Sequence, residues 1–462
     1  MKREEKNKLT KKKVSYYIKY TLICIVLISS MMISGGCESS PTKQNNGYIE
    51  GDGDINITKK GRSSASFRIL ATENVLIDWG DGSPITRHRF NAKSEPRVFS
   101  HFFYDENIYY TIRIVGNIIH LDARNIYNIE LINVSYLEYL MLRRNNKSTY
   151  ICLKNAESLI YLNVAGNHLK SLDVTNNALL EYLLFHGNEI QSIDLSNNIS
   201  LKFLWASFNG LSEIDVSNNT ALEVLGFGNN NIADLNVSNN KNLVFLNVED
   251  NNLRSLDVSN NVLLDELILA SNELTTIDLS KNIYLRTLNI GRNRISNLNL
   301  SNNIHLQTLS GHLNEMEYID LSKNINLMDL FLSSNRINRI DVSNSKILDR
   351  IVIDNNQLPY IDLRNNLKLR NLFLGNNNLE KVYLSADTVD LRFIDVHNNH
   401  LSIESMNELF ESLPDRTLAI QISLMDIRNN PGERGSDRSI AESKGWHLTR
   451  VNTELKNVTI NK

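Results

Sequence analysis

The motif LDELILASNELTTIDLSKN, residues 264–282, sets the architecture of this chain. Its apolar residues keep no 3.6-residue period, and the L-x-L step before an N-x-L turn is typical of a short strand that enters a turn. The motif recurs every 21 residues, with a last step of 22. Its turn asparagines are Asn167, Asn188, Asn209, Asn230, Asn251, Asn272, Asn293, Asn314, Asn335, Asn356, Asn377 and Asn399. A fixed period of this length predicts a repeat solenoid whose coils stack on one another.

Each coil has a predicted inner and outer side. Leu267 and Leu269 of the L-x-L step point to one face of a strand, and the residue between them points to the other. The turn asparagine is expected to be buried and to pair with backbone groups of adjacent coils, because buried polar backbone needs partners. A similar second half, L-D-V/L-S-x-N, ends in a further asparagine column from Asn177 to Asn366, with Ser345 in one coil. This half predicts a second short strand on the opposite side.

The unit L-x-x-L-x-L-x-x-N-x-L-x-x-L-D-V/L-S-x-N resembles the leucine-rich repeat in its 21-residue bacterial form. The resemblance covers residues 118–401. It implies about 13 coils of 21 residues with short parallel strands and few helices.

The first 36 residues are predicted to be a signal peptide. A basic head precedes an apolar stretch at residues 20–33, which as a helix would span about 21 Å and is too short for the roughly 30 Å core of a bilayer. Ser34, two glycines and Cys37 follow, and this end resembles a bacterial lipoprotein signal. That resemblance implies lipidation of Cys37 as the new N-terminus; an ordinary cleaved signal is the alternative. Residues 37–50 are polar and suit a tether.

Residues 51–117 show short alternating apolar runs between turns, which indicate strands. The sequence DWGDG at 78–82, HFFY at 101–104 and YTIRI at 110–114 resemble the corresponding motifs of PKD-type immunoglobulin-like domains. The resemblance implies a small β-sandwich that serves as a spacer on secreted bacterial proteins. We interpret Asp78 and Asp81 as turn residues, because aspartate followed by glycine favours tight turns.

Residues 402–462 break the repeat and are predicted to cap the solenoid. Ser402 is a candidate N-cap of a helix whose face carries Ile403, Met406, Phe410 and Leu413. Residues 418–424 alternate like a strand, and Trp446 is expected to seal the core. This end resembles the α/β cap of leucine-rich-repeat surface lipoproteins of Bacteroidetes.

Charge and cysteine content exclude several protein classes. Residues 1–36 hold eight basic and two acidic residues, so the rest of the chain carries a net charge of −9. That charge argues against phosphate-driven nucleic-acid binding. Beyond Cys24 and Cys37 only Cys152 remains, so the mature part has no intrachain disulfide.

No catalytic, metal or cofactor motif is apparent in the sequence. His186 and His312 lie six coils apart, about 29 Å at the strand spacing, so they share no metal; His397 lies in a later turn. Gly226-Phe227-Gly228 lacks the following helix and basic residue of a phosphate loop. Cys152 has no base placed by a motif. We therefore predict that the protein is not an enzyme.

An aspartate recurs in the second half of the unit. Neighbouring carboxylates on stacked coils repel, so the column is expected to face solvent or to be offset by donors such as Ser196 and Ser217. A calcium ladder is the open alternative. The column contains Asp173, Asp194, Asp215, Asp257, Asp278, Asp320, Asp341 and Asp362, with Asn236 and Asn299 in two coils.

The outward strand positions of the N-terminal coils carry aromatic residues. The register places Tyr161, Tyr182, Phe203, Trp205 and Phe245 side by side on the open sheet face. A contiguous aromatic patch of this kind is a candidate partner site, and the alternative is that the rings pack only on one another.

We therefore predict a cell-surface protein, held in the outer membrane by its lipid anchor, that mediates protein–protein interaction or adhesion. Its partner would be a protein on a host or microbial surface. The alternative function is a glycan-binding accessory lipoprotein for nutrient capture, since aromatic rings also stack on sugars.

Overall fold

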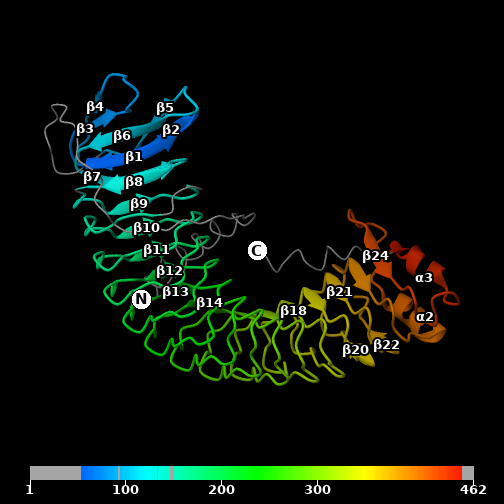
Figure 1. The fold of residues 1–462 in the computed structure, drawn as a ribbon. Helices are drawn as coiled ribbons and strands as arrows, with labels where there is room; N and C mark the ends of the chain where they lie inside the picture. The colour runs from blue at the N-terminus through cyan, green and yellow to red at the C-terminus, as the bar shows by residue number, and fades with distance from the viewer. Residues whose placement is uncertain (1–53, 92–93, 133, 146–149, 450–462) are drawn as a thin grey trace.

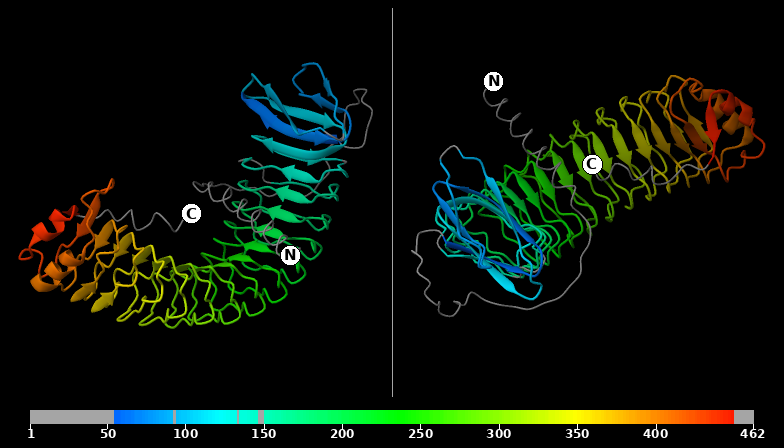
Figure 2. Two further views of the ribbon diagram at one scale, coloured as in Figure 1. Left: turned by 180° about the vertical axis from the view of Figure 1, so that it is seen from behind. Right: turned by 90° about the horizontal axis from the view of Figure 1, so that it is seen from above.

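A computed structural model describes residues 54–449 except 92–93, 133 and 146–149. They form a curved rod with an all-β part at the N-terminal end and a cap with two helices at the other (Figures 1 and 2). The expected signal peptide, Cys37 and the tether up to residue 50 lie outside the described residues. No described helix is long and apolar enough to cross a bilayer.

The N-terminal part contains an antiparallel sheet in the order β4-β3-β6-β1-β8. Its strands are β1 (Asp54–Lys60), β3 (Val75–Asp78), β4 (Thr86–His88), β6 (Tyr109–Val115) and β8 (Asn128–Leu131). A second group pairs antiparallel as β5 (Arg97–Phe102), β2 (Ser64–Ala71) and β7 (Ile118–Arg124). In β2 every second residue is buried, and Phe67 stacks on Trp79 at 5.2 Å between ring centroids. The two expected turn aspartates accept backbone N–H groups two residues on, at 2.9 Å and 3.0 Å.

The second N-terminal group and the solenoid share one sheet. Strand β7 pairs antiparallel with β2 on one side and parallel with β9 (Tyr139–Met141) on the other. The sequence analysis places the end of the N-terminal β-domain at residue 117. Strands β7 and β8 lie after that residue, so the N-terminal sheets extend to Leu131. The backbone hydrogen-bond ladder therefore runs without interruption from the antiparallel strands into the repeats.

The repeats form one parallel ladder with one strand per coil, which confirms the predicted solenoid (Figure 1). Its strands after β9 are β10 (Tyr161–Asn163), β11 (Tyr182–Leu184), β12 (Phe203–Trp205), β13 (Val224–Gly226), β14 (Phe245–Asn247), β15 (Glu266–Ile268), β16 (Thr287–Asn289), β17 (Thr308–Ser310), β18 (Asp329–Phe331), β19 (Arg350–Val352), β21 (Asn371–Phe373) and β23 (Phe393–Asp395). These thirteen strands, β9 included, agree with the expected number of coils. Two strands of the cap, β24 (Ser423–Asp426) and β25 (Trp446–Leu448), continue the ladder.

Eleven of the twelve turn asparagines are buried, as predicted, and Asn209 is half-buried. Asn272 donates through Nδ2 to the carbonyl oxygens of Val248 (2.9 Å) and Leu269 (3.1 Å), and its Oδ1 accepts the N–H of Leu253 at 3.0 Å. Two of these three partners belong to the preceding coil. Leu267 and Leu269 have no exposed surface, so each coil stacks a leucine layer and an amide bridge on its neighbour.

The second half of the coil differs from the prediction. A second strand forms only at β20 (Tyr360–Asp362) and β22 (Lys381–Tyr383), and the remaining described coils close with turns. The second asparagine column is nevertheless buried as a set of bridges between coils: Asn282 is fully buried and donates to the carbonyl oxygens of Val258 (3.1 Å) and Asn261 (3.0 Å). Side-chain amides thus satisfy carbonyl groups in the turns of the second half, including the coil that forms β20, where Asn366 makes the same two bonds at 2.9 Å.

The cap contains α2 (Ile403–Ser412), β24, α3 (Arg438–Ser443) and β25. The hydroxyl of Ser402 accepts the N–H of Ser405, as expected of an N-cap, and α2 buries Met406, Leu409 and Phe410. Ile403 is instead exposed, and the predicted strand at 418–424 begins only at residue 423. Trp446 is 1% exposed and donates Nε1–H to the Pro414 carbonyl at 3.0 Å, consistent with a seal on the last coil.

We predict that Asn272→Ala lowers the free energy of unfolding by about 3 kcal/mol, because it leaves a backbone N–H and two carbonyl groups of the interior without their partner. Urea unfolding followed by circular dichroism measures this change. The matched control is Asn302→Ala, since Asn302 is exposed and makes one bond, to the Ser280 carbonyl at 3.0 Å. Its effect should stay within about 0.5 kcal/mol; equal losses for both variants would contradict the structural role of the buried amide.

Candidate functional site

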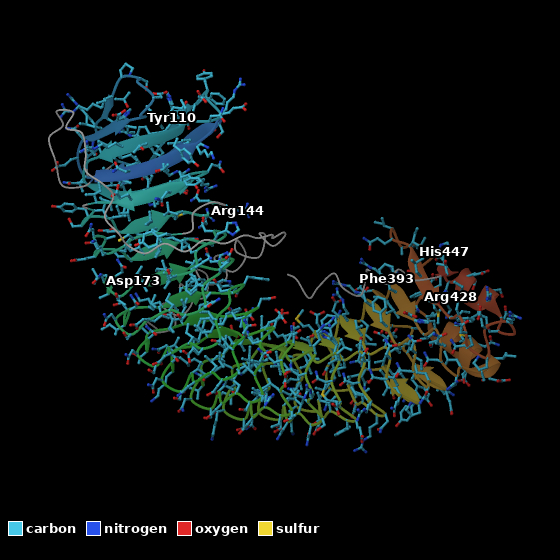
Figure 3. All side chains as sticks on the ribbon, viewed as in Figure 1. Tyr110, Arg144, Asp173, Phe393, Arg428 and His447 are labelled. Carbon is cyan, nitrogen blue, oxygen red and sulfur yellow. The ribbon has the colours of Figure 1, made fainter. Side chains whose placement is uncertain are left out.

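The candidate site is the inner, concave face of the parallel ladder. In each ladder strand from β9 to β23 the middle residue, a leucine or isoleucine, points into the core, as Leu204 does, and its two neighbours, here Phe203 and Trp205, point outward. Seen from above, the strands lie side by side as an open ladder across the hollow of the arc (Figure 2). In Figure 3 the residue Arg144 lies toward this hollow and Asp173 toward the outer side.

The structure brings all five predicted aromatic residues together in one stacked row. Ring centroids lie 6.1 Å apart for Tyr161 and Tyr182, 6.3 Å for Tyr182 and Phe203, and 5.9 Å for Phe203 and Trp205. Trp205 reaches Phe245, two coils on, at 5.7 Å. The row continues toward the N-terminus through Tyr139 and His120. We call these seven residues, His120, Tyr139, Tyr161, Tyr182, Phe203, Trp205 and Phe245, the aromatic ladder.

The members of the aromatic ladder differ in exposure. Phe203 and Phe245 are only 8% and 4% exposed, because Leu184 and Val224 pack with them. Tyr161, Tyr182 and Trp205 are half-buried and Tyr139 is 39% exposed. The two phenylalanines are therefore buried links within the row, and the tyrosines and Trp205 provide its accessible surface.

A glycine holds the position of Trp205. A Cβ atom on Gly226 would lie 2.8 Å from Cδ2 and Cε3 of the indole, so only glycine lets the ring lie flat across β13. Gly226 and Trp205 are cross-strand partners. This role of Gly226 was not predicted from the sequence; the signal for it is a glycine at an outward strand position directly after the coil that carries Trp205.

Carboxylates follow the aromatic ladder along the concave face. Glu249 and Glu266 belong to the coils of β14 and β15, and Glu266 is the cross-strand partner of Phe245. Burial raises the pKa of both groups above the ordinary value of 4.5, with neighbouring aspartates adding to the shift. Neither makes an ion pair within the described part of the chain.

A second apolar cluster lies at the C-terminal end of the concave face. Beside it lies a charged cluster made of Asp395, His397, Asp426 and Arg428. Phe331, Val352 and Phe373 are buried together, with Phe393 and Leu424 against them; Figure 3 labels Phe393. The charged cluster was not predicted, because Asp426 comes from the cap and pairs with Asp395 only through the β23–β24 register.

The charged cluster places His397 beside two buried carboxylates. His397 Nδ1 lies 2.5 Å from Asp395 Oδ1, and Arg428 donates to both oxygens of Asp426 at 2.8 and 2.6 Å. Among the described residues, Asp395, His397 and Asp426 are the one group of three such side chains close enough to hold a metal ion. Arg428 already lies on one of the three ligands and supplies positive charge there, so the arrangement is explained as a charge-compensated cluster.

The other residues considered for chemistry lie apart. Burial, with Arg143 and Arg144 nearby, lowers the pKa of His186 to about 4, so its ring is neutral at pH 7. His312 lies six coils from His186 and packs on Gly291 of the adjacent coil. Its Nδ1 lies 3.0 Å from Ser310 Oγ. Cys152 is half-buried in an early coil. These three side chains therefore form no common centre.

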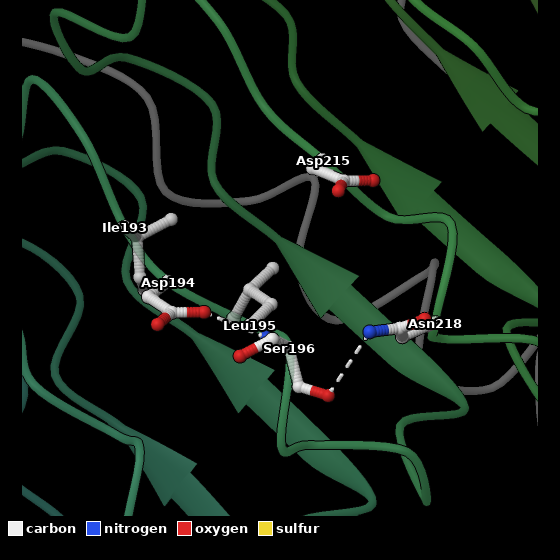
Figure 4. A pocket seen from close by; sticks show the side chains of 6 residues that line it. All are labelled: Ile193, Asp194, Leu195, Ser196, Asp215 and Asn218. Carbon is white, nitrogen blue, oxygen red and sulfur yellow. Dashed lines mark hydrogen bonds between the residues drawn. The ribbon is translucent and has the colours of Figure 1, made fainter.

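The aspartate column lies outside the concave face and is exposed. Asp194 Oδ1 accepts the N–H of Ser196 at 2.9 Å, and Asp215 Oδ1 that of Ser217 at 2.8 Å. Figure 4 shows the small hollow between these two coils, where Asn218 Nδ2 also donates to the Ser196 carbonyl at 3.4 Å. Both expected means of relieving repulsion, exposure and donors from the serines, are thus present, and each carboxylate caps its own turn.

The aspartate column should make the free energy of unfolding depend on pH in the acid range. Hydrogen bonds from the serine two residues on hold the pKa values of Asp194, Asp215, Asp257, Asp278 and Asp320 below their ordinary 3.8. A depressed pKa in the folded state means that the unfolded chain binds protons more readily. The stabilisation is therefore present above pH 3.8 and is lost as the pH falls through the folded values.

We predict that changing these five aspartates to asparagine flattens the loss of thermal stability between pH 5 and pH 2. Asn236 and Asn299 already hold the same turn in two coils, so the backbone bond survives the change. Calorimetry across this pH range measures the effect. An unchanged slope for the fivefold variant would show that the acid sensitivity comes from other groups.

Comparisons with known proteins identify the fold. No family model matches the sequence, and no curated protein matches it. The functional domain of InlJ from Listeria monocytogenes is similar at a TM-score of 0.54 and 23% identity, over 70% of this chain and 77% of that one. The internalin InlF of the same species is similar at a TM-score of 0.54 and 23% identity, over 59% of this chain and 85% of that one.

A leucine-rich-repeat protein of Leptospira interrogans is similar at a TM-score of 0.55 and 22% identity, over 62% of this chain and 77% of that one. These values, with the stacked leucine and asparagine columns, establish that the chain has the leucine-rich-repeat solenoid fold.

Proposed function

We propose that this chain is a non-enzymatic protein-binding module that captures a protein partner on its concave face. The observation that carries this proposal is the aromatic ladder, a continuous row of stacked rings on the open side of the arc. Tyrosine and tryptophan supply large contact area at small entropic cost and are enriched among residues that dominate binding energy. The ladder is preformed, since each ring is held by its neighbour.

The stacking favours a protein partner over the glycan alternative. A sugar packs on a free ring face, but Tyr182, Phe203 and Trp205 turn their faces toward neighbouring rings at interplanar angles of 30° and 19°. The accessible members of the row include Tyr139, Tyr161, Tyr182 and Trp205, which combine apolar rings with polar O–H and N–H groups. Such a surface suits the mixed apolar and polar contacts of a protein interface.

The likeness of fold gives further support. In the structure of the LRIM1/APL1C complex two proteins are bound to each other, and this chain is similar to it at a TM-score of 0.51 and 19% identity, over 71% of this chain and 62% of that one. That structure supports protein binding by analogy of fold.

We also propose that the module is displayed at the cell surface, in the outer membrane, for adhesion. Support comes from the sequence: the lipoprotein-like signal that ends at Cys37, the polar tether at 37–50 and the PKD-like motifs of the N-terminal sheets. A lipid on Cys37 and a β-domain beyond it would hold the concave face away from the membrane.

The anchor has a direct test. We expect Cys37→Ser to abolish incorporation of labelled palmitate and to move the protein from the membrane fraction to the soluble fraction. The matched control is Cys24→Ser, which removes the other cysteine of the signal region. Membrane retention and labelling of the Cys37 variant would contradict lipidation at this residue.

The binding surface is tested by a Tyr182→Ala/Trp205→Ala double variant. A partner captured by crosslinking from host or microbial surface extracts is purified, and its Kd for the full chain is measured by biolayer interferometry. We expect the double variant to weaken binding at least about tenfold, because it removes two accessible rings of the row.

Tyr360→Ala serves as the control, since Tyr360 is a 57% exposed tyrosine on β20, away from the concave face. Equal Kd values for the double variant and the control would overturn the proposal. Loss of binding to polysaccharide, with protein binding unchanged, would establish the glycan alternative.

A further inference from the structure

An exposed apolar stripe runs along one flank of the arc. It lies where the chain leaves the second asparagine column and returns to the ladder strand, at the two positions that follow each buried asparagine. Six apolar side chains occupy these positions in four successive coils, and each is between 42% and 56% exposed. We call Val262, Leu263, Ile283, Tyr284, Ile304 and Ile325 the flank stripe.

The fold of the coil does not require apolar residues at these positions. Lys241 occupies the first of them in the coil before the flank stripe. Its turn closes in the same way as a turn of the stripe, because the N–H of Leu243 bonds to the Asn240 carbonyl at 3.1 Å and that of Leu285 to the Asn282 carbonyl at 3.2 Å. Single exposed apolar residues are ordinary, but a contiguous row that the fold does not require marks a contact surface.

The flank is suited to a long contact. The bend of the arc is seen face-on in Figure 1, whereas from above the rod runs nearly straight (Figure 2). A flank is therefore close to flat over several coils. Met328 and Ile347, 42% and 43% exposed, extend the stripe at its C-terminal end. The eight side chains present on the order of 700 Å², near the roughly 800 Å² per partner that a stable interface buries.

We propose that the flank stripe joins two copies of this chain in an antiparallel dimer. A second copy carries the same rows of side chains at the same coil spacing, so the rows interdigitate along the whole stripe when a twofold axis crosses its centre. That axis falls between Ile283 and Ile304 and places Ile283 of each copy near Ile304 of the other. The four coils have no charged residue at the stripe positions, as is typical of the core of an interface between identical subunits.

Charged columns on both borders of the flank stripe favour this register. With the axis at the centre, exposed Lys281 on one border faces Asn302 of the second copy. On the other border Arg286 faces Gln307. A shift by one coil instead places Lys281 against Lys281 or against Lys323 of the second copy, depending on its direction. Like charges in contact repel, so the centred register brings all four coils together without this cost.

Lys241 and Lys346 mark the two ends of the contact. Both are exposed and lie one coil beyond the flank stripe, so Lys241 of each copy lies near Lys346 of the other. Their long stems let the ammonium groups turn into solvent, where salt screens the remaining repulsion. The dimer should therefore become tighter as the salt concentration rises. Both concave faces stay open on the same side, so the dimer displays two aromatic ladders.

Sedimentation velocity measures the oligomeric state of the full chain. Every protein tested carries Cys37→Ser, so that no lipid at this residue holds copies together. We expect a reversible dimer with twice the 52.8 kDa mass of the chain and a micromolar or lower Kd. The Kd should fall at least about twofold between about 0.15 M and about 0.5 M salt, because the lysine repulsion is screened.

A double variant tests the flank stripe directly. Ile283→Lys/Ile304→Lys should raise the Kd at least about a hundredfold, because the two copies would then bring four ammonium groups to the axis. Lys241 shows that the turn accepts lysine, and unfolding curves verify that the variant is folded. The matched control is Ile199→Lys, since Ile199 has the same turn position outside the stripe and is 61% exposed. It should change the Kd less than about threefold.

The outcomes separate the dimer from other occupants of the stripe. A chain that stays monomeric at every concentration, or a dimer that the double variant leaves unchanged, overturns the proposal. A monomer that binds vesicles of phosphatidylethanolamine and phosphatidylglycerol, and loses this binding in the double variant, would show instead that the stripe lies on a membrane. A dimer that weakens as salt rises would contradict the centred register. Each of these failures leaves the concave interface standing, because the Tyr182→Ala/Trp205→Ala variant tests it separately.

Discussion

The amide bridge between coils is the interaction on which the rest of the structure depends. A coil of 21 residues has only three in a ladder strand, so most of its backbone groups must be satisfied by other means. Asn272 and its equivalents do this across the coil boundary, while the leucine layer beneath excludes water. The strands are held at about 4.8 Å by their ladder, whereas the opposite side consists mostly of turns and is free to spread. The rod therefore curves with the strands inside, and this curvature makes the concave face.

The two ends of the rod cover their exposed strand edges and leucines with different structures. An open end would leave strand edges and leucines in water. At the N-terminal end β7 joins the antiparallel strand β2, so the first coil is covered by a sheet that is part of the same ladder. At the other end α2 and Trp446 cover the last leucines while β24 and β25 prolong the ladder. The concave face is consequently one rigid surface from end to end.

The sequence predicts the features that recur in every coil, but it does not predict contacts that occur in a single coil. The leucine and asparagine columns predicted the solenoid, because each position is tested a dozen times along the chain. The second strand was predicted for the repeat in general, but among the described coils it forms only at β20 and β22, because the resemblance of L-D-V/L-S-x-N to the first half does not by itself bring about strand pairing. The register also placed five aromatic residues in one row, but not the burial of Phe203 and Phe245, which depends on how rings pack. The Asp395–Asp426 pair required a strand from the cap.

Glycines shape the concave face as much as the aromatic residues do. Each coil must keep its inward leucines and its turn asparagine, so only the outward columns are free to vary without loss of the fold. A ring placed in one coil needs space on the next, and glycine provides it: Gly226 beneath Trp205, Gly291 beneath His312 and Gly375 beneath His397. A wall built from near-identical coils thus acquires local relief where a glycine interrupts an outward column, because the side chain of the next coil can lie across it.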